Sequence, residues 1–390
     1  MALRFLTAGE SHGPALSVIV EGLPAGVPIP REAVDRELRR RMGGYGRGAR
    51  MKIEQDQVEF LGGVRFGLTI GAPVALVIRN RDFANWVEAM APEGPRPSGE
   101  ASREVRRPRP GHADLAGALK YGIHDARDVI ERASARETAA RTAAGALARC
   151  LLAEAGIEVT SRTVAVGPVS APEQAVDDFD ALRGLPDDAP MRCVDERTAA
   201  AMMRAVDEAR AAGDSIGGVF EVLARGVPPG LGSHAHWDRR LDGLLGGAIL
   251  SIQAVKAVAV GEGMESASRR GSEQHDPIHH GPERGFFRPT NRAGGIEGGI
   301  SNGEMIRVRG YLKPLATLAR PLASVDLVDK TAVLAEVERT DTIPIVAAGV
   351  VGEAMACLVL ADELLRKFGG DHIRETLANL TSYRAGLRRF

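Results

Sequence analysis

Apolar side chains recur along this chain in two kinds of pattern, and each pattern predicts a different kind of element. Short segments rich in valine, leucine and isoleucine predict β-strands. They are residues 15–21, 57–61, 74–78, 217–226 and 305–311. The first is followed by the turn-forming run Gly22-Leu-Pro-Ala-Gly, so the chain is expected to change direction there.

Longer segments dominated by strong helix formers predict α-helices between these strands. One begins near residue 31, where Pro30 suits a helix start, and the others span 131–156, 198–212, 240–257 and 352–368. Gly156 is placed to end the second of them. Residues 91–109, rich in proline, charge and small residues, predict a mobile surface connection, so one domain over residues 1–390 is expected.

The composition is that of a soluble globular chain with a sizeable core. The chain has 390 residues, 44% of them hydrophobic, and a formal net charge of -1, which argues against a general nucleic-acid binder. Its 46 glycines and only 4% aromatic residues favour ligand binding through tight loops over aromatic stacking platforms.

The cysteines, the first residues of the chain and the lengths of the apolar runs together predict a cytoplasmic location. Cys150, Cys193 and Cys357 are too few and too scattered for a disulfide framework, which indicates a reducing compartment. No signal peptide is expected before the first candidate loop, and no apolar run approaches membrane-spanning length, so no membrane partner is expected. The histidine-rich segment 275–280 lies in a polar stretch without a clear scaffold, and no metal is assigned.

Two histidines stand in similar glycine-bounded segments. His12 lies in Gly9-Glu-Ser-His-Gly, and His112 lies in Arg109-Pro-Gly-His-Ala-Asp. Histidine titrates near neutral pH, and glycine lets backbone and ligand approach closely. A single such histidine would be read as a turn residue bonded to nearby backbone, but two of them favour acid catalysis on a phosphorylated substrate.

Arginines gather near the first of these segments. Several fall within residues 31–50, and Ser134 and Arg136 come at the start of the long predicted helix, where free backbone N–H groups suit an anion. Arginine offers a planar fork to phosphate or carboxylate. The alternatives are a solvated helix face paired with acidic neighbours and an ordinary capped helix. A further anion-binding candidate joins residues 291–303, 313–317 and 339–341.

At these residues the chain resembles the chorismate synthase family. The matching motifs are spread over most of the chain. They are Gly9-Glu-Ser-His-Gly, Arg109-Pro-Gly-His-Ala-Asp, Arg132-Ala-Ser-Ala-Arg-Glu-Thr, Gly294-Gly-Ile-Glu-Gly-Gly-Ile-Ser-Asn-Gly and Lys313-Pro. The resemblance implies conversion of 5-enolpyruvylshikimate 3-phosphate to chorismate and phosphate, by 1,4-anti elimination with reduced FMN and no net redox change.

The resemblance also implies roles for individual residues. His12 is expected to protonate the departing phosphate, His112 to donate a proton to the flavin ring system, and Asp341 to relay the substrate proton. The substrate-binding positions it implies are Ser11, Arg41, Arg47, Arg109, Arg136 and Arg339. The FMN-binding positions it implies are Arg132, Ala133, Ser134, Gln253, Ala254, Gly298, Lys313, Pro314, Leu315, Ala316, Thr317 and Arg339.

The family's fold is an α+β fold, a β-α-β sandwich with helices packed between two antiparallel sheets, and its members form homotetramers. No flavin-reductase domain is evident, so a monofunctional enzyme with an external flavin reductant is expected. One departure from the family is visible: residues 128–131 read Asp-Val-Ile-Glu where many relatives have glycines, so their loop flexibility does not carry over to this segment. A flavin-dependent oxidoreductase acting on a phosphorylated metabolite and a non-catalytic binder of such metabolites are the competing hypotheses.

Overall fold

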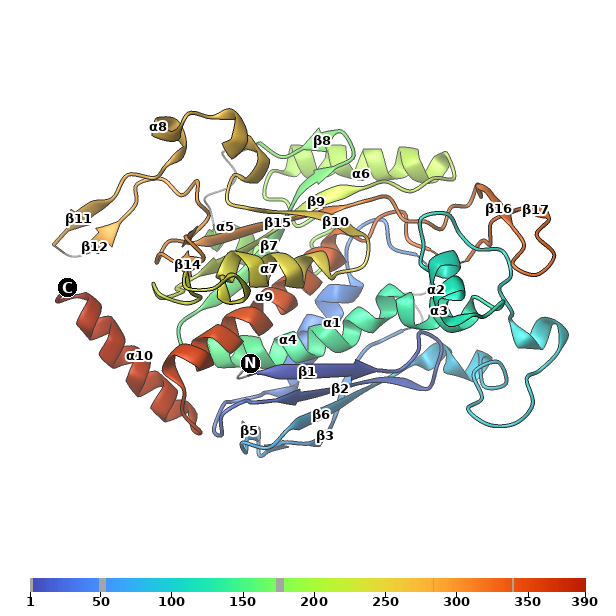
Figure 1. The fold of residues 1–390 in the computed structure, drawn as a ribbon, viewed down its shortest axis with the longest axis horizontal. Helices are drawn as coiled ribbons and strands as arrows, with labels where there is room; N and C mark the ends of the chain where they lie inside the picture. Colours follow the sequence, from blue (N-terminus) through green and yellow to red (C-terminus); the bar gives the residue numbers. More distant parts are fainter. Residues whose placement is uncertain (1–2, 49–53, 173–178, 283, 339) are drawn as a thin grey trace.

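Two antiparallel sheets form the framework of the chain, shown in a computed structural model that describes residues 3–48, 54–172, 179–282, 284–338 and 340–390 (Figure 1). The first sheet has the order β1-β2-β6-β3, with β1 at Arg4–Ala8, β2 at Ala15–Glu21, β6 at Val74–Arg79 and β3 at Val58–Gly62. The second has the order β10-β15-β9-β7-β8, with β10 at Val255–Val260, β15 at Ile306–Leu312, β9 at Gly218–Arg225, β7 at Glu158–Val166 and β8 at Val169–Ser170.

Four two-stranded hairpins complete the strands of the described ranges. They are β4 (Val64–Arg65) with β5 (Leu68–Thr69), β11 (His279–Gly281) with β12 (Gly285–Phe287), β13 (Ile296–Glu297) with β14 (Ile300–Ser301), and β16 (Ala323–Val325) with β17 (Ala332–Leu334). The α-helices are α1 (Arg31–Met42), α2 (Asp114–Tyr121), α3 (Arg127–Ala133), α4 (Thr138–Glu154), α5 (Phe179–Gly184), α6 (Glu196–Ala211), α7 (Leu241–Leu250), α8 (Gly271–Gln274), α9 (Ile345–Phe368) and α10 (Ile373–Leu387). This mixture of helices and antiparallel sheets confirms the predicted α+β class.

Helices pack on the inner face of each sheet. In β2, Leu16, Val18 and Val20 alternate with less buried residues, so one face of the first sheet is apolar, and α4 packs against it through β2 and β6. Helix α9 packs against β7 and β9 of the second sheet, and α4 packs on α9. Figure 1 shows α4 and α9 lying between the strands of the two sheets. One cluster of buried hydrophobic residues, from Leu3 to Leu380, runs through all of these elements.

The prediction that no apolar run approaches membrane-spanning length is wrong for α9, the one described helix that is long and apolar enough to cross a membrane. However, 89% of its most apolar window is buried inside the protein. Its hydropathy is therefore accounted for by its place between the second sheet, α4 and α1.

Two of the predicted helices differ from the structure. The segment predicted as one helix over 131–156 is divided, because Ser134 has an extended backbone (ψ 140°) and its hydroxyl accepts a hydrogen bond from the Arg136 N–H at the start of a new turn. The prediction of helix over 240–257 is wrong after residue 250. There Ala254 adopts φ +68°, and the segment from Val255, with valines at 255, 258 and 260, pairs with β15 instead.

Gly145 allows the close approach of α4 to α9, and its replacement with alanine is expected to destabilise the protein. A Cβ on Gly145 would lie 2.3 Å from the Ala354 Cβ, so the helices would have to separate, at a cost of about 1–3 kcal/mol. In contrast, Gly247→Ala in α7 places its Cβ in open space and should be neutral or slightly stabilising, because alanine favours helix. Urea denaturation of both variants would check this; equal midpoints would contradict it.

Candidate active site

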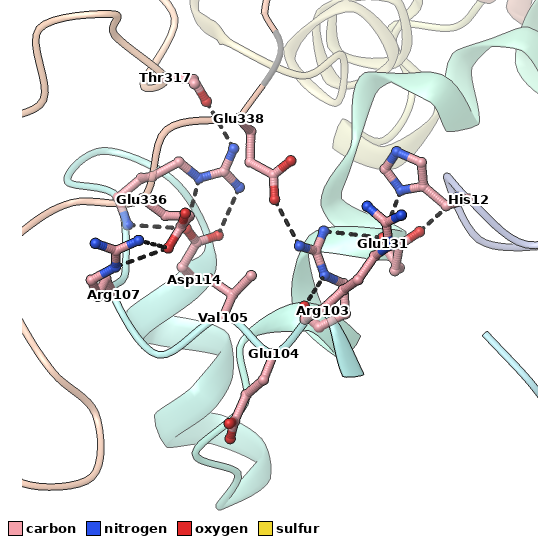
Figure 2. Close-up of polar contacts among 12 residues, drawn as sticks. His12, Arg103, Glu104, Val105, Arg107, Asp114, Glu131, Thr317, Glu336 and Glu338 are labelled. Carbon is pink, nitrogen blue, oxygen red and sulfur yellow. Dashed lines mark hydrogen bonds and ion pairs between the residues drawn. The ribbon is translucent and has the colours of Figure 1, made fainter. Parts of the chain in front are cut away.

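His12 lies in the loop between β1 and β2, and it is held by contacts on two sides. Its Nδ1 is 2.8 Å from Glu131 Oε1, and its backbone N–H donates to Glu131 Oε2 at 2.7 Å. The imidazole also stacks on the Trp86 ring, with centroids 3.8 Å apart and planes inclined by 21°. Figure 2 shows the histidine directed toward the Glu131 carboxylate from the neighbouring loop. His12 and Glu131 are both buried, so the position of this ring is strongly constrained.

The ionised form of Glu131 is stabilised by these neighbours. Burial alone would raise the pKa of this carboxyl, but the hydrogen bonds from His12 and the charge of Arg127 together hold the pKa below its usual value. Arg127 Nη1 lies 3.5 Å from Glu131 Oε1, and its other terminal nitrogen donates to Glu338 Oε1 at 2.8 Å. Glu131 is therefore a carboxylate that faces His12 on one side and a buried cation on the other.

His112 forms a second cluster with Arg109 and Asp114 at the start of α2. Asp114 Oδ1 accepts a hydrogen bond from His112 Nδ1, and Asp114 Oδ2 accepts from Arg109 Nε at 2.9 Å. Burial would raise the pKa of Asp114, but the bonds from His112 and Arg109 lower it strongly. Arg109 Nη1 reaches across to Thr317 Oγ1 at 2.8 Å, which attaches the cluster to the segment after β15.

Gly111 shapes the loop that carries His112. It has φ +80°, a conformation that favours glycine, and its carbonyl accepts a hydrogen bond from Lys313 Nζ at 2.9 Å. The Lys313 N–H in turn donates to the Ala254 carbonyl at 3.0 Å. Two of the segments that the resemblance assigns to flavin binding, those of Ala254 and Lys313, therefore meet beside the His112 loop.

A third cluster consists of arginines and carboxylates at the ends of α1 and η4 (Ala135–Glu137). Arg136 Nη1 donates to Asp56 Oδ2 at 2.7 Å, Arg41 Nη1 lies 3.6 Å from the same oxygen, and Arg47 Nη1 lies 2.9 Å from Asp341 Oδ2. Burial first, and then the repulsion from Arg136 and Arg47, lower the pKa of Arg41 to about 9. The guanidinium stays charged at neutral pH, and the repulsion would be relieved by a bound anion.

Two donors of this cluster have an unmet need for an acceptor. Arg41 Nη1 and Arg136 Nη2 are buried without a hydrogen-bond partner, which is costly unless a ligand supplies one. The remaining Arg136 nitrogen, Nε, donates to Asn80 Oδ1 at 2.9 Å, and the Asn80 amide donates to the Gly13 carbonyl at 2.7 Å. The arginine cluster is thereby joined to the His12 loop.

Other arginines predicted near this site have different surroundings. Arg39 is exposed and pairs with Glu32 on the outer face of α1, as the solvated-face alternative proposed. Arg40 points into the core, where it pairs with Glu353. Arg339, predicted for both substrate and FMN, lies outside the described residues.

Two of the predicted flavin contacts lie at a cavity of about 380 Å³ beside β1. Arg132 and Gln253 both line it. Arg132 donates to the Thr7 and Gly9 carbonyls at 2.9 and 3.0 Å, and Gln253 Nε2 lies 3.3 Å from Glu137 Oε2. The Gln253 Oε1 is buried without a hydrogen-bond partner.

Gly298 is a predicted flavin contact that lies away from both histidine clusters. It lies in the turn of the β13–β14 hairpin, and within the described residues no contact joins it to the His12 or His112 cluster. Ser134 is central by comparison, because its hydroxyl accepts from Ser11 Oγ at 3.1 Å. Ala133 stands beside it at the end of α3, and Pro314, Leu315 and Ala316 continue the segment after Lys313.

Comparison with known proteins identifies the family. The sequence profile of the family described as chorismate synthase matches residues 3–365, most of the chain. The chain belongs to the chorismate synthase family. It is 57% identical over 386 residues to chorismate synthase of Desulforudis audaxviator (strain MP104C), covering 99% of this chain and 98% of that one. It is 54% identical over 388 residues to chorismate synthase of Symbiobacterium thermophilum, covering 98% of each.

A solved chorismate synthase structure has the same fold. The two align with a TM-score of 0.78 at 39% identity, over 100% of this chain and 99% of the other. The two histidine motifs of this chain lie in the two clusters described above. Arg127 of the first cluster bonds Glu338, and Arg107, two residues before Arg109 of the second, bonds Glu336 in the same segment (Figure 2).

Four residues of the site are absent from the sequence-based prediction: Glu131, Trp86, Arg127 and Asp56. Glu131 carried a signal, since it belongs to the segment that departs from the family's glycines. No sequence signal pointed to Trp86 or Arg127, because their roles depend on a stacking geometry between distant segments.

The histidine-rich segment 275–280 packs rings on aromatic neighbours: the His280 and Phe286 ring centroids are 4.9 Å apart. The described residues contain no group of three or more His, Cys, Asp or Glu side chains that could hold a metal ion.

The Asp114 cluster predicts a dependence of stability on pH. Because the folded-state pKa of Asp114 lies below its ordinary value of 3.8, the stabilisation is present above that value and is lost as the pH falls below it. Asp114→Asn is expected to cost about 1–3 kcal/mol at neutral pH. Melting temperatures measured from about pH 5 to about pH 2 should converge for the two proteins. Asp128→Asn, at an exposed position of α3, is the control; parallel curves for wild type and Asp114→Asn would contradict the assignment.

Proposed function

We propose that this chain converts 5-enolpyruvylshikimate 3-phosphate to chorismate and phosphate by 1,4-anti elimination, the last step of the shikimate pathway, with reduced FMN as its cofactor. Membership of the chorismate synthase family supports the reaction. One observation supports assigning the reaction to these residues. The loop of the buried His12–Glu131 pair is linked through Asn80 to Arg136, and Arg136 and its neighbour Arg41 each have a buried donor without a hydrogen-bond partner. An acid joined to buried arginine donors that can take an anionic acceptor is the arrangement that departure of phosphate requires.

Substrate binding is assigned to the arginine cluster. Arg41, Arg47 and Arg136 bring three positive charges together, while Arg109 adds one from the His112 cluster and Arg339 completes the proposed set. Ser11 contributes a hydroxyl next to His12. Charge-assisted hydrogen bonds from buried arginines hold phosphate and carboxylate groups in fixed directions and exclude water from them.

The elimination breaks one C–O bond and one C–H bond and forms a C=C double bond, so electrons balance without net oxidation. His12 donates a proton to the departing phosphate oxygen. Since Nδ1 is held by Glu131, delivery takes place through Nε2. Asp341, which accepts from Arg47 and from the Gly48 N–H at 2.6 Å, relays the proton lost from carbon.

The residues around Gly111, Ala254 and Gln253 fit a flavin. The left-handed backbone at Gly111 and Ala254 permits close approach, and the buried Gln253 Oε1 lacks a donor that a flavin would provide. Arg132, Ala133, Ser134, Gln253, Ala254, Gly298, Lys313 to Thr317 and Arg339 would hold FMN, and His112 would donate a proton to its ring system. Reduced FMN supplies electron density that assists loss of phosphate.

The whole chain is proposed to act as one catalytic domain. In this proposal the two sheets and the helices between them form the β-α-β sandwich of the family, four copies assemble, and the enzyme works in the cytoplasm with FMN reduced by an external source. The shared hydrophobic cluster supports the single domain.

Product stoichiometry tests the proposal. The protein is incubated anaerobically with chemically reduced FMN and 5-enolpyruvylshikimate 3-phosphate, and phosphate, chorismate and reduced flavin are measured together. Equal release of both products with reduced FMN retained is the expected result. Consumption of one reduced flavin in each turnover would favour an oxidoreductase, and ligand binding without product would favour a non-catalytic binder.

A further inference from the structure

Glu131 occupies a position that the reaction described above does not use. It stands in the last turn of α3, and its side chain is only 2% exposed. Both carboxylate oxygens are directed at one residue: Oε1 at the His12 ring and Oε2 at the His12 backbone. A buried carboxylate is costly unless it is fully paired, so this arrangement needs an account beyond packing.

Arg127 and Trp86 hold the other sides of this pair. The Arg127 guanidinium is 3.5 Å from Glu131 and lies 5.1 Å from the centre of the Trp86 ring, on which His12 stacks. Arg103 approaches the same ring, with its guanidinium carbon 4.2 Å from the centre. The indole is thus fixed by two cations and in turn limits the tilt of the imidazole.

The same arginine connects His12 to the segment that leads to Asp341. Arg127 Nη2 donates to Glu338, three residues before Asp341, and its Nε donates to the Arg103 carbonyl at 3.0 Å. Figure 2 shows Glu338 between the His12–Glu131 pair and the cluster around Asp114. One buried cation therefore contacts both the partner of His12 and a residue of the segment that precedes Asp341.

We infer that Glu131 is the positioning residue for His12, orienting its ring through Nδ1 and stabilising its positively charged form for proton donation through Nε2. The inference rests on the proposed function, in which His12 is the acid. The interaction between the two groups is mutual. A protonated His12 stabilises the ionised form of Glu131, and the Glu131 carboxylate stabilises the protonated form of His12 by the same free energy. Among the described residues, the charged groups around the ring include Glu131, Arg127 and Arg103, with Glu338 paired to Arg127. Glu131 hydrogen-bonds to the imidazole itself.

The test compares Glu131→Gln and Glu131→Asp with the control Glu104→Gln, whose side chain is exposed and points away from the cluster in Figure 2. Exchange of the His12 Cε1 hydrogen for deuterium, followed by mass spectrometry over a pH series, reports the midpoint of ring titration without substrate or flavin. In Glu131→Gln the midpoint should fall by about one to three pH units, because a neutral amide replaces the carboxylate. In Glu131→Asp, which keeps the charge, it should stay nearer to the wild-type value.

Activity provides the second readout. Glu131→Gln should lower kcat for phosphate release by about 10- to 100-fold, with KM for the substrate little changed, and the alkaline limb of the pH profile should move to lower pH. Glu131→Asp should recover part of the loss, and Glu104→Gln should match wild type. If Glu131→Gln does not fold, Glu131→Ala takes its place: a kcat and a His12 midpoint equal to those of wild type overturn the inference.

The two readouts separate the two levels of the argument. An unchanged His12 midpoint in Glu131→Gln overturns the positioning role whatever the enzyme does. A wild-type protein that releases no phosphate, while its His12 midpoint still depends on Glu131, overturns the proposed function and leaves the pairing in place.

Discussion

Replacement of His12 with alanine is expected to lower kcat for chorismate formation by about 10²- to 10⁴-fold, the usual contribution of a general acid. The imidazole lies at the junction of the Glu131 carboxylate, the Trp86 ring and the loop tied by Asn80 to Arg136. Alanine keeps this loop but removes the proton donor. Binding of substrate to the arginine cluster should be largely retained, so the loss should be found in kcat rather than in KM.

Anaerobic assays with reduced FMN, measuring phosphate and chorismate, would determine the two constants. His236→Ala is the matched control, because His236 is exposed and pairs only locally in the described contacts, with Asp238 at 2.6 Å. It should behave as wild type. A His12→Ala enzyme with near-normal kcat would remove His12 from the acid role, and a loss confined to KM would make it a binding residue.

The framework of this fold was predictable because its strands carry their own pattern. The expected strands at 15–21, 217–226 and 305–311 agree with β2, β9 and β15 to within one residue, since each presents a dense apolar face to the core. Where the sequence pattern misled, a single backbone conformation decided the outcome. Ser134 interrupts a run of strong helix formers, and Ala254 turns the chain from α7 into β10, and neither conformation is encoded in apolar periodicity.

The site was predictable in part, through motifs whose glycines and histidines lie close together in sequence. Asp114 follows His112 by two residues, and their pairing is local. The partners of His12 are different, because Glu131 is 119 residues away and reaches it only once α3 docks against the β1–β2 loop. Trp86 likewise gains its role by stacking rather than by a motif. A residue-type pattern identifies an acid, whereas the groups that orient it become visible only in the folded chain.

Replacement of Glu353 with glutamine is expected to lower the free energy of unfolding by about 3–5 kcal/mol, the cost of leaving buried charge without its partner. Glu353 is fully buried in α9, and its carboxylate accepts from both terminal nitrogens of Arg40 at 2.8 Å, from Ser161 Oγ at 2.6 Å and from Arg149. Burial would raise its pKa, but Arg40 and Arg149 lower it strongly. Glutamine keeps the shape and offers one acceptor, so Glu37 is left as the one buried carboxylate that the described contacts give to both Arg40 and Arg149.

An exposed ion pair, Arg79–Glu59, serves as the control, because it shows how much of the loss of stability comes from burial of the charges. Glu59→Gln removes the partner of Arg79 at 3.2 Å on the exposed side of the first sheet, where water screens the charges, and little change is expected. Urea denaturation at one fixed protein concentration would measure both variants, because an assembly adds a concentration term to apparent stability. Equal midpoints would show that the Arg40–Glu353–Arg149 network contributes specificity of packing rather than stability. A large drop for Glu353→Gln alone would show that the contact of α9 with α1 and α4 depends on charge as well as on apolar surface, and that the helices carrying Arg41 and Thr138 are held in place by it.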